Sequence, residues 1–207
     1  LPTGSGDPYA LRRVANGIVQ SISHRKWDFN IFTLADIALE LISKQTKLEA
    51  NAYGKVHSFL EQRITGLLKT KGIAYDVIDS VMHIDKSHIF DLENRAKALN
   101  DLKSKPHFIH LVIGFKRVAN IIADTTEFVP FNKEKLVEPE EINLYESLQK
   151  LHNDIDFALQ NKDYPLALQF LIAFGKDIDA FFDAVLVNCD DEVLCKNRDS
   201  LLREVKK

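Results

Sequence analysis

Apolar residues recur at intervals of three and four along most of the chain, which is the periodicity of amphipathic α-helices. The pattern predicts a series of helices, over residues 8–22, 34–44, 51–70, 75–81, 91–103, 108–123, 140–159, 165–185 and 188–202. No alternation of apolar and polar residues is long enough to predict a strand. The predicted fold class is therefore all-α, arranged as a helical bundle.

Several helix ends carry the residues that helix termini favour. Asp7 stands where an N-cap belongs, and Pro8 suits the first helical position after it. Gly72 follows the third predicted helix as a C′ glycine should. The segment from Thr125 to Pro139 has no periodicity, so we interpret it as a loop.

The helix predicted over residues 108–123 separates apolar from polar side chains most clearly. At about 100° per residue, one face collects the apolar side chains Phe108, Leu111, Val112, Phe115, Ala119 and Ile122. The opposite face collects Lys116, Arg117 and Asn120. This helix is therefore expected to present two cations and an amide as an outward patch.

Composition places the chain among ordinary globular proteins: 207 residues, 45% hydrophobic and 28% charged. Two cysteines, Cys189 and Cys195, exclude a disulfide framework and a four-cysteine zinc site, and we interpret them as inert thiols in a reducing compartment. No apolar run approaches the roughly 20 residues that span a bilayer, and the polar start is not a signal peptide. Because the only methionine is Met82, we expect this chain to be part of a longer protein.

Charge is divided along the chain. Residues 51–135 hold 13 basic and 10 acidic side chains, whereas residues 136–207 hold 8 basic and 15 acidic ones. A nucleic-acid partner would therefore have to meet a local basic face, with the middle third as the best place for it. The acidic last third is either a solvated helical face or a surface that repels wrongly oriented RNA.

Motifs for catalysis are missing from the sequence. It contains no Gly-rich phosphate loop, no Gly-x-Ser-x-Gly and no His-Glu-x-x-His. His107 and His110 are three residues apart, but no third ligand lies near them in the sequence. We therefore assign no catalytic residue, no metal ligand and no cofactor to this chain.

Six segments, in order, resemble the β subunit of bacterial-type heterotetrameric glycyl-tRNA synthetase. They are GSGDPYALRRVA at 4–15, FLEQRI at 59–64, GIAYDVI at 72–78, RAKAL at 95–99, FKRVANI at 115–121 and FFDAVLV at 181–187. The resemblance implies the C-terminal region of that subunit: residues 1–50 as a helical connector and 51–207 as a helical anticodon-binding domain of the DALR type. It further implies a cytoplasmic α2β2 enzyme in which the α subunit activates glycine with ATP and Mg and the β subunit recognises glycine tRNA.

An anticodon loop offers phosphates to cations and unpaired bases to amide and guanidinium groups. On the resemblance, the tRNA-binding residues are Lys116, Arg117 and Asn120, joined by Arg95 and by Arg12 and Arg13.

Each of these residues has an alternative role. Arg95 could form a salt bridge with Asp91, four residues earlier. Lys116 and Arg117 could be a solvated face, and Asn120 could cap a helix or bridge two helices. Arg12 and Arg13 have theirs in packing against the rest of the β subunit. A purely structural scaffold that docks the subunits is the alternative for the whole chain.

Overall fold

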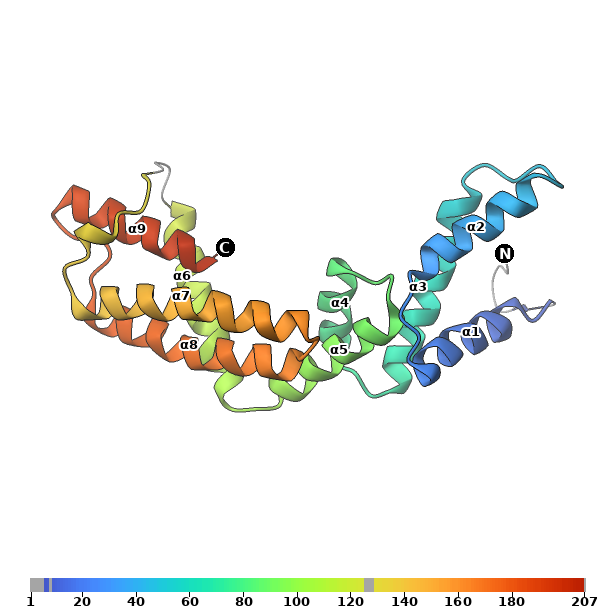
Figure 1. Ribbon diagram of the computed structural model, residues 1–207, viewed down its shortest axis with the longest axis horizontal. Helices are drawn as coiled ribbons and strands as arrows, with labels where there is room; N and C mark the ends of the chain where they lie inside the picture. Colours follow the sequence, from blue (N-terminus) through green and yellow to red (C-terminus); the bar gives the residue numbers. More distant parts are fainter. Residues whose placement is uncertain (1–5, 8, 125–128, 207) are drawn as a thin grey trace. The chain divides into compact units, whose positions relative to one another are not determined.

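The computed structural model describes residues 6–7, 9–124 and 129–206. Within these residues it contains α-helices, one short 3-10 helix (η1) and no strand, which confirms the all-α prediction (Figure 1). In chain order the elements are α1 Leu11–Arg25, α2 Ile31–Ser43, α3 Ala52–Thr70, α4 Tyr75–Ile84, α5 Ile89–Lys103, α6 His107–Asp124, η1 Lys133–Lys135, α7 Pro139–Gln160, α8 Tyr164–Ala184 and α9 Glu192–Lys206.

The chain divides into two compact units, Leu1–Asn100 and Asp101–Lys207. The sequence placed the boundary between connector and binding domain at residues 50 and 51, whereas α1 and α2 pack against α3 inside the first unit. That packing buries Val19, Ile22, Ile64 and Leu68 in one core. These helix contacts define the compact units, whereas the division into a connector and a binding domain at residues 50 and 51 stays a prediction.

The first unit shows how local chemistry shifts helix ends from their predicted positions. Helix α1 begins at Leu11, not at Pro8, which lies outside the described residues. Asp7 still serves that end, because its carboxylate accepts the Arg12 N–H. Helix α2 begins at Ile31, before its predicted start at residue 34, because Asn30 caps it by accepting the N–H groups of Phe32 and Thr33. Gly72 follows the C-cap of α3 with φ 79°, as predicted for a residue that must adopt the left-handed region.

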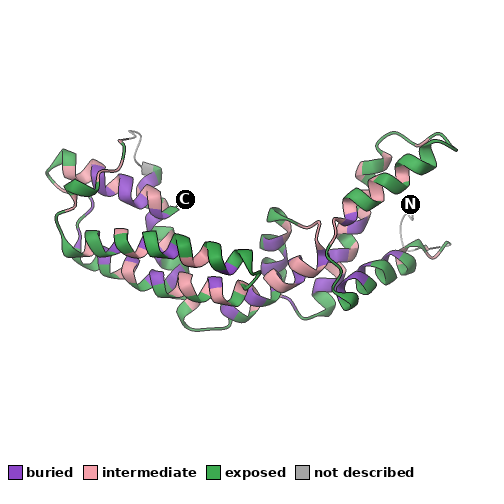
Figure 2. Ribbon diagram, in the orientation of Figure 1, coloured by how far each residue is buried: buried purple, intermediate pink, exposed green. Residues whose placement is uncertain are grey.

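The second unit is built on the long pair α7 and α8, with α6 and α9 packed on it (Figure 1). Its core is made of apolar side chains from all four helices; it includes Val118, Leu144, Leu148, Ile178, Phe181, Leu201 and Leu202. Figure 2 shows the buried residues gathered on the inner faces of these helices. This packing fixes which face of each helix points to solvent.

Helix α7 begins where the predicted loop ends. Pro139 is its first residue. Glu138 at the N-cap and Glu141 in the first turn form a capping box. The predicted loop also contains the 3-10 turn η1. Asp163 caps α8 by accepting the Leu166 N–H at 3.1 Å, so this helix starts one residue before Pro165.

Candidate nucleic-acid interface

Helix α6 presents Lys116, Arg117 and Asn120, and all three side chains are exposed to solvent. The helix is held by its opposite side, where Leu111, Val118 and Ile122 are buried. The predicted apolar face was wrong in part, because Val112 is 46% exposed while Val118, which was not assigned to it, is fully buried. The buried stripe of α6 is therefore shifted by about one position from the predicted stripe, because the helix packs against both α8 and α9.

Close contact with α8 explains why α6 carries a glycine in its middle. A Cβ at Gly114 would lie 3.3 Å from Cγ2 of Ile178 and 3.7 Å from a carboxylate oxygen of Asp179. The two helix backbones therefore approach more closely at this point than larger residues allow.

Arg117 stacks on an aromatic ring of the neighbouring helix. Its guanidinium carbon lies 4.2 Å from the ring centroid of Phe182, which packs edge-on against Phe181. Such a contact orients the guanidinium plane and lowers the entropy lost when it binds a ligand. Among the described residues, the side chains of Lys116 and Asn120 have no hydrogen-bond or ion-pair partner. The patch is therefore neither sealed in the bundle nor neutralised by a carboxylate.

Arg95 lies in the first unit and is engaged there. Its Nε donates to a carboxylate oxygen of Asp91 at 3.0 Å, and its Nη2 donates to the carbonyl of Asp85. Only 15% of the Arg95 side chain is exposed. The salt bridge named as the alternative is thus present, and two of the three guanidinium nitrogens donate within the first unit.

Arg12 and Arg13 belong to the first turn of α1. Arg12 is half-buried, and its Nη1 donates to the carbonyl of Gly6 at 3.3 Å. Arg13 is exposed. The structure separates these two positions: Arg12 helps to hold the start of the helix, and Arg13 points to solvent.

Sequence reasoning missed a second cluster of cations and aromatic rings, in the first unit. Arg63 lies 5.1 Å from the ring of Phe59, and Lys69 lies 5.7 Å from the ring of Tyr75, which is 72% exposed. Arg63, Lys69 and Tyr75 line a hollow of about 530 Å³. Glu61 and Asp79 line it too, so its charge is balanced and favours phosphate less than the α6 patch does. Helical spacing of aromatic and basic residues on α3 and α4 was the signal available for it.

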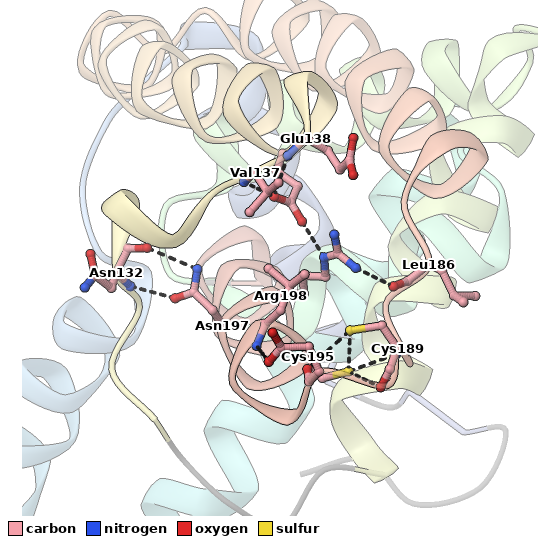
Figure 3. Close-up of polar contacts among 11 residues, drawn as sticks. Asn132, Val137, Glu138, Leu186, Cys189, Cys195, Asn197 and Arg198 are labelled. Carbon is pink, nitrogen blue, oxygen red and sulfur yellow. Dashed lines mark hydrogen bonds and ion pairs between the residues drawn. The ribbon is translucent and has the colours of Figure 1, made fainter.

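A polar network joins α7, α9 and the segments beside them in the second unit (Figure 3). The Nε of Arg198 donates to Glu141, and its Nη1 donates to the carbonyl of Leu186 at 2.7 Å. Beside it, Asn197 and Asn132 exchange two hydrogen bonds of 2.9 and 3.0 Å. The sequence did not predict the pair of Arg198 and Glu141, because these residues lie 57 positions apart and a sequence does not report which acid a distant arginine will meet.

Sites for other chemistry are not formed within the described residues. They contain no group of three His, Cys, Asp or Glu side chains that could hold a metal ion, and His107 and His110 are exposed. No helix among them has both the length and the apolar character needed to cross a bilayer. A hollow of about 180 Å³ between α7 and α8 contains Lys150 but also Asp154 and Asp177, a combination that does not attract anions.

Comparison with known families gives two matches that together cover most of the chain. Residues 1–83 match the model described as glycyl-tRNA synthetase beta subunit, and residues 111–207 match the DALR anticodon binding domain. The second match contains the whole α6 patch.

Individual relatives agree with these matches over the full length of the chain. A glycine–tRNA ligase beta subunit of Clostridioides difficile is 33% identical over 99% of the chain, and one of Geotalea uraniireducens is 33% identical over all of it. One of Acinetobacter baumannii is 36% identical over 99% of the chain. The chain spans about 30% of the length of each of these relatives.

Proposed function

This chain belongs to the family of glycyl-tRNA synthetase β subunits, and we propose that it serves tRNA recognition in a glycine–tRNA ligase. One observation carries the proposal. Within the residues that match an anticodon-binding domain, α6 holds Lys116, Arg117 and Asn120 on an open surface without carboxylate partners among the described residues. The partner is glycine tRNA, bound through its anticodon loop.

The chemistry of the patch suits a single-stranded loop. Lys116 supplies a mobile charge for phosphate oxygens. Arg117, stacked on Phe182, offers its other face to a splayed base. Asn120 supplies an amide donor and acceptor for the Watson–Crick edge of a base. Arg13 is a candidate for a further contact, whereas Arg95 and Arg12 already donate hydrogen bonds within the first unit.

The rest of the enzyme supplies the reaction in this proposal. The α subunit attaches glycine to the tRNA with ATP and Mg, and two α and two β subunits form the cytoplasmic enzyme. In this proposal the chain itself is the non-catalytic part of the enzyme. The β subunit contributes affinity and selects the tRNA.

Binding to glycine tRNA tests the proposal directly. The 207-residue chain is titrated with glycine tRNA and with the same tRNA carrying a substituted anticodon, in a gel-shift series. Lys116→Ala with Arg117→Ala is expected to weaken binding, because both cations leave the patch. Lys150→Ala with Lys176→Ala removes the same charge from exposed positions of α7 and α8 and is the matched control. Equal binding by the patch variant and the wild-type chain would refute the site, and indifference to the anticodon would refute the function.

A structural scaffold is the second candidate, and one observation favours it. Helix α2 leaves Leu34, Ile37 and Leu41 each about half exposed on one side, at 51%, 51% and 56%. Such a face is typical of a docking surface for another protein segment. This candidate expects no tRNA affinity in the gel-shift series, but binding of the chain to the remaining part of a β subunit or to an α subunit.

A further inference from the structure

Cys189, in the connection between α8 and α9, meets Cys195, in the first turn of α9. Their Sγ atoms are 2.7 Å apart (Figure 3). Non-bonded heavy atoms pack at about 3.5–4.0 Å, whereas the bond of a disulfide is about 2.05 Å long. The two sulfurs are therefore closer than those of two independent thiols. A small rotation of the side chains would bring them to bonding distance.

The start of α9 brings this pair together. The Asp191 carboxylate caps the helix by accepting the N–H groups of Val193 at 2.9 Å and Leu194 at 3.1 Å. Cys195 continues the same turn, since its N–H donates to the Asp191 carbonyl at 2.9 Å. This turn directs the Cys195 side chain back to Cys189, six residues earlier.

Two further hydrogen bonds hold the Cys195 sulfur beside Cys189. The Cys189 N–H donates to Sγ of Cys195 at 2.8 Å, and the Cys195 thiol donates to the Cys189 carbonyl at 2.9 Å. Both residues are half-buried rather than sealed in the core. The pair is thus preorganised and still within reach of a small reagent.

We propose that Cys189 and Cys195 are not the inert thiols expected from the sequence but a redox-active pair, which closes to a reversible disulfide by exchange with a low-molecular-weight disulfide. The Cys189 thiolate attacks one sulfur of the reagent, which releases one thiolate and leaves a mixed disulfide on Cys189. The Cys195 thiolate then attacks Sγ of Cys189 and releases the second thiolate. The two cysteines lose two electrons and two protons in total, and the reagent is reduced to two thiols.

The surroundings assign the two roles. Burial and the neighbouring Cys189 raise the pKa of the Cys195 thiol, although Arg198 opposes this shift. Because the Cys195 thiol also donates its proton to the Cys189 carbonyl at 2.9 Å, we assign the attacking role to Cys189. Once Cys189 carries the mixed disulfide, the short distance lets Cys195 complete the exchange.

The oxidised turn is tied to the core of the second unit. Leu186, three residues before Cys189, accepts a hydrogen bond from Arg198, three residues after Cys195. A disulfide adds a covalent link between these same two segments. The reaction needs no RNA and no second subunit, so it is independent of the proposed function.

Intact-mass measurement after incubation with glutathione disulfide tests the proposal on the 207-residue chain. The folded chain is expected to lose the mass of two hydrogen atoms, to resist alkylation at both cysteines and to recover both thiols with dithiothreitol. Cys195→Ser is expected to retain one glutathione on Cys189, and Cys189→Ser to react far more slowly. The wild-type result stands without the variants if either fails to fold.

Other outcomes would overturn the proposal. A folded wild-type chain that keeps two alkylatable thiols, accumulates glutathione without closing, or forms a disulfide-linked dimer has no such pair. The same chain unfolded in urea is the control for preorganisation. Closure in the folded chain must be faster than in urea, and equal rates would mean that the fold contributes nothing.

Discussion

Arg198 and Glu141 form an ion pair that solvent does not reach. Glu141 is 0% exposed and Arg198 is 5% exposed, and the guanidinium Nε donates directly to the carboxylate. The other carboxylate oxygen accepts the N–H groups of Val137 at 2.7 Å and Glu138 at 3.0 Å. The pair therefore joins α9 to the first turn of α7. The same carboxylate also gives hydrogen-bond acceptors to the two backbone N–H groups that precede this helix.

Removing one partner of this pair is expected to destabilise the second unit strongly. Arg198→Met leaves the Glu141 carboxylate buried without its counter-charge, which costs about 3–5 kcal/mol in free energy of unfolding. Glu192→Gln breaks the exposed pair with Lys196 on the same helix and is expected to cost less than about 1 kcal/mol. Urea denaturation of both variants measures the difference in free energy of unfolding. Similar losses would show that the buried pair stabilises the unit no more than an exposed pair does.

Acid is expected to weaken the first unit through Glu93. Burial raises the pKa of this carboxyl, but hydrogen bonds from Lys71 and Ser23 outweigh burial and hold the pKa below its ordinary value of 4.5. A lowered folded-state pKa means that the unfolded chain binds the proton more tightly. The stabilisation is therefore complete above pH 4.5 and is lost as the pH falls through the lower, folded-state pKa.

Glu93→Gln isolates this contribution. The difference in unfolding free energy between wild type and variant, measured by urea denaturation, should be largest near neutral pH and shrink in acid. Lys71→Ala should lower stability more than Lys97→Ala, because Lys97 lies 3.4 Å from Glu93 and is 57% exposed. A gap between wild type and Glu93→Gln that stays constant down to acid pH would contradict the assignment.

Glycine-to-alanine substitutions should separate close helix contacts from open ones. Gly17 on α1 and Gly66 on α3 have no atom within 4 Å of an added Cβ, so alanine should stabilise each helix by about 0.5–1 kcal/mol. At Gly114 the added Cβ meets the fully buried Ile178, a side chain with little freedom to move. Gly114→Ala should therefore gain nothing or lose stability in thermal unfolding. An equal gain at all three positions would show that α6 and α8 have room to separate.

Charge and base reading should be separable on α6. Lys116→Ala is expected to lower the slope of log K against log salt by about 0.7, the share of one phosphate contact in single-stranded nucleic acid. Asn120→Ala should leave this slope unchanged and reduce the preference for the native anticodon by about 1–3 kcal/mol. Titrations at several salt concentrations measure both quantities. A change of slope with Asn120→Ala would assign this residue to the backbone instead.

The α6 patch was predictable because it depends on a local property. Residues 116, 117 and 120 share a helix face at any orientation of the helix, so periodicity alone places them together. Their exposure agrees with that prediction. The burial of Val118 and the exposure of Val112 did not follow, because two neighbouring helices, not one, decide where the apolar stripe ends.

The sequence by itself determined the helices, the position of Gly72 and the outward direction of Lys116, Arg117 and Asn120, since these depend on the nearest few residues. Only the tertiary structure decided that Arg198 meets Glu141, that Arg117 rests on Phe182 and that Lys71 reaches Glu93. Each of these contacts joins residues far apart in the chain. A periodic pattern states that a side chain faces inward or outward, but the partner it finds there depends on how whole helices pack.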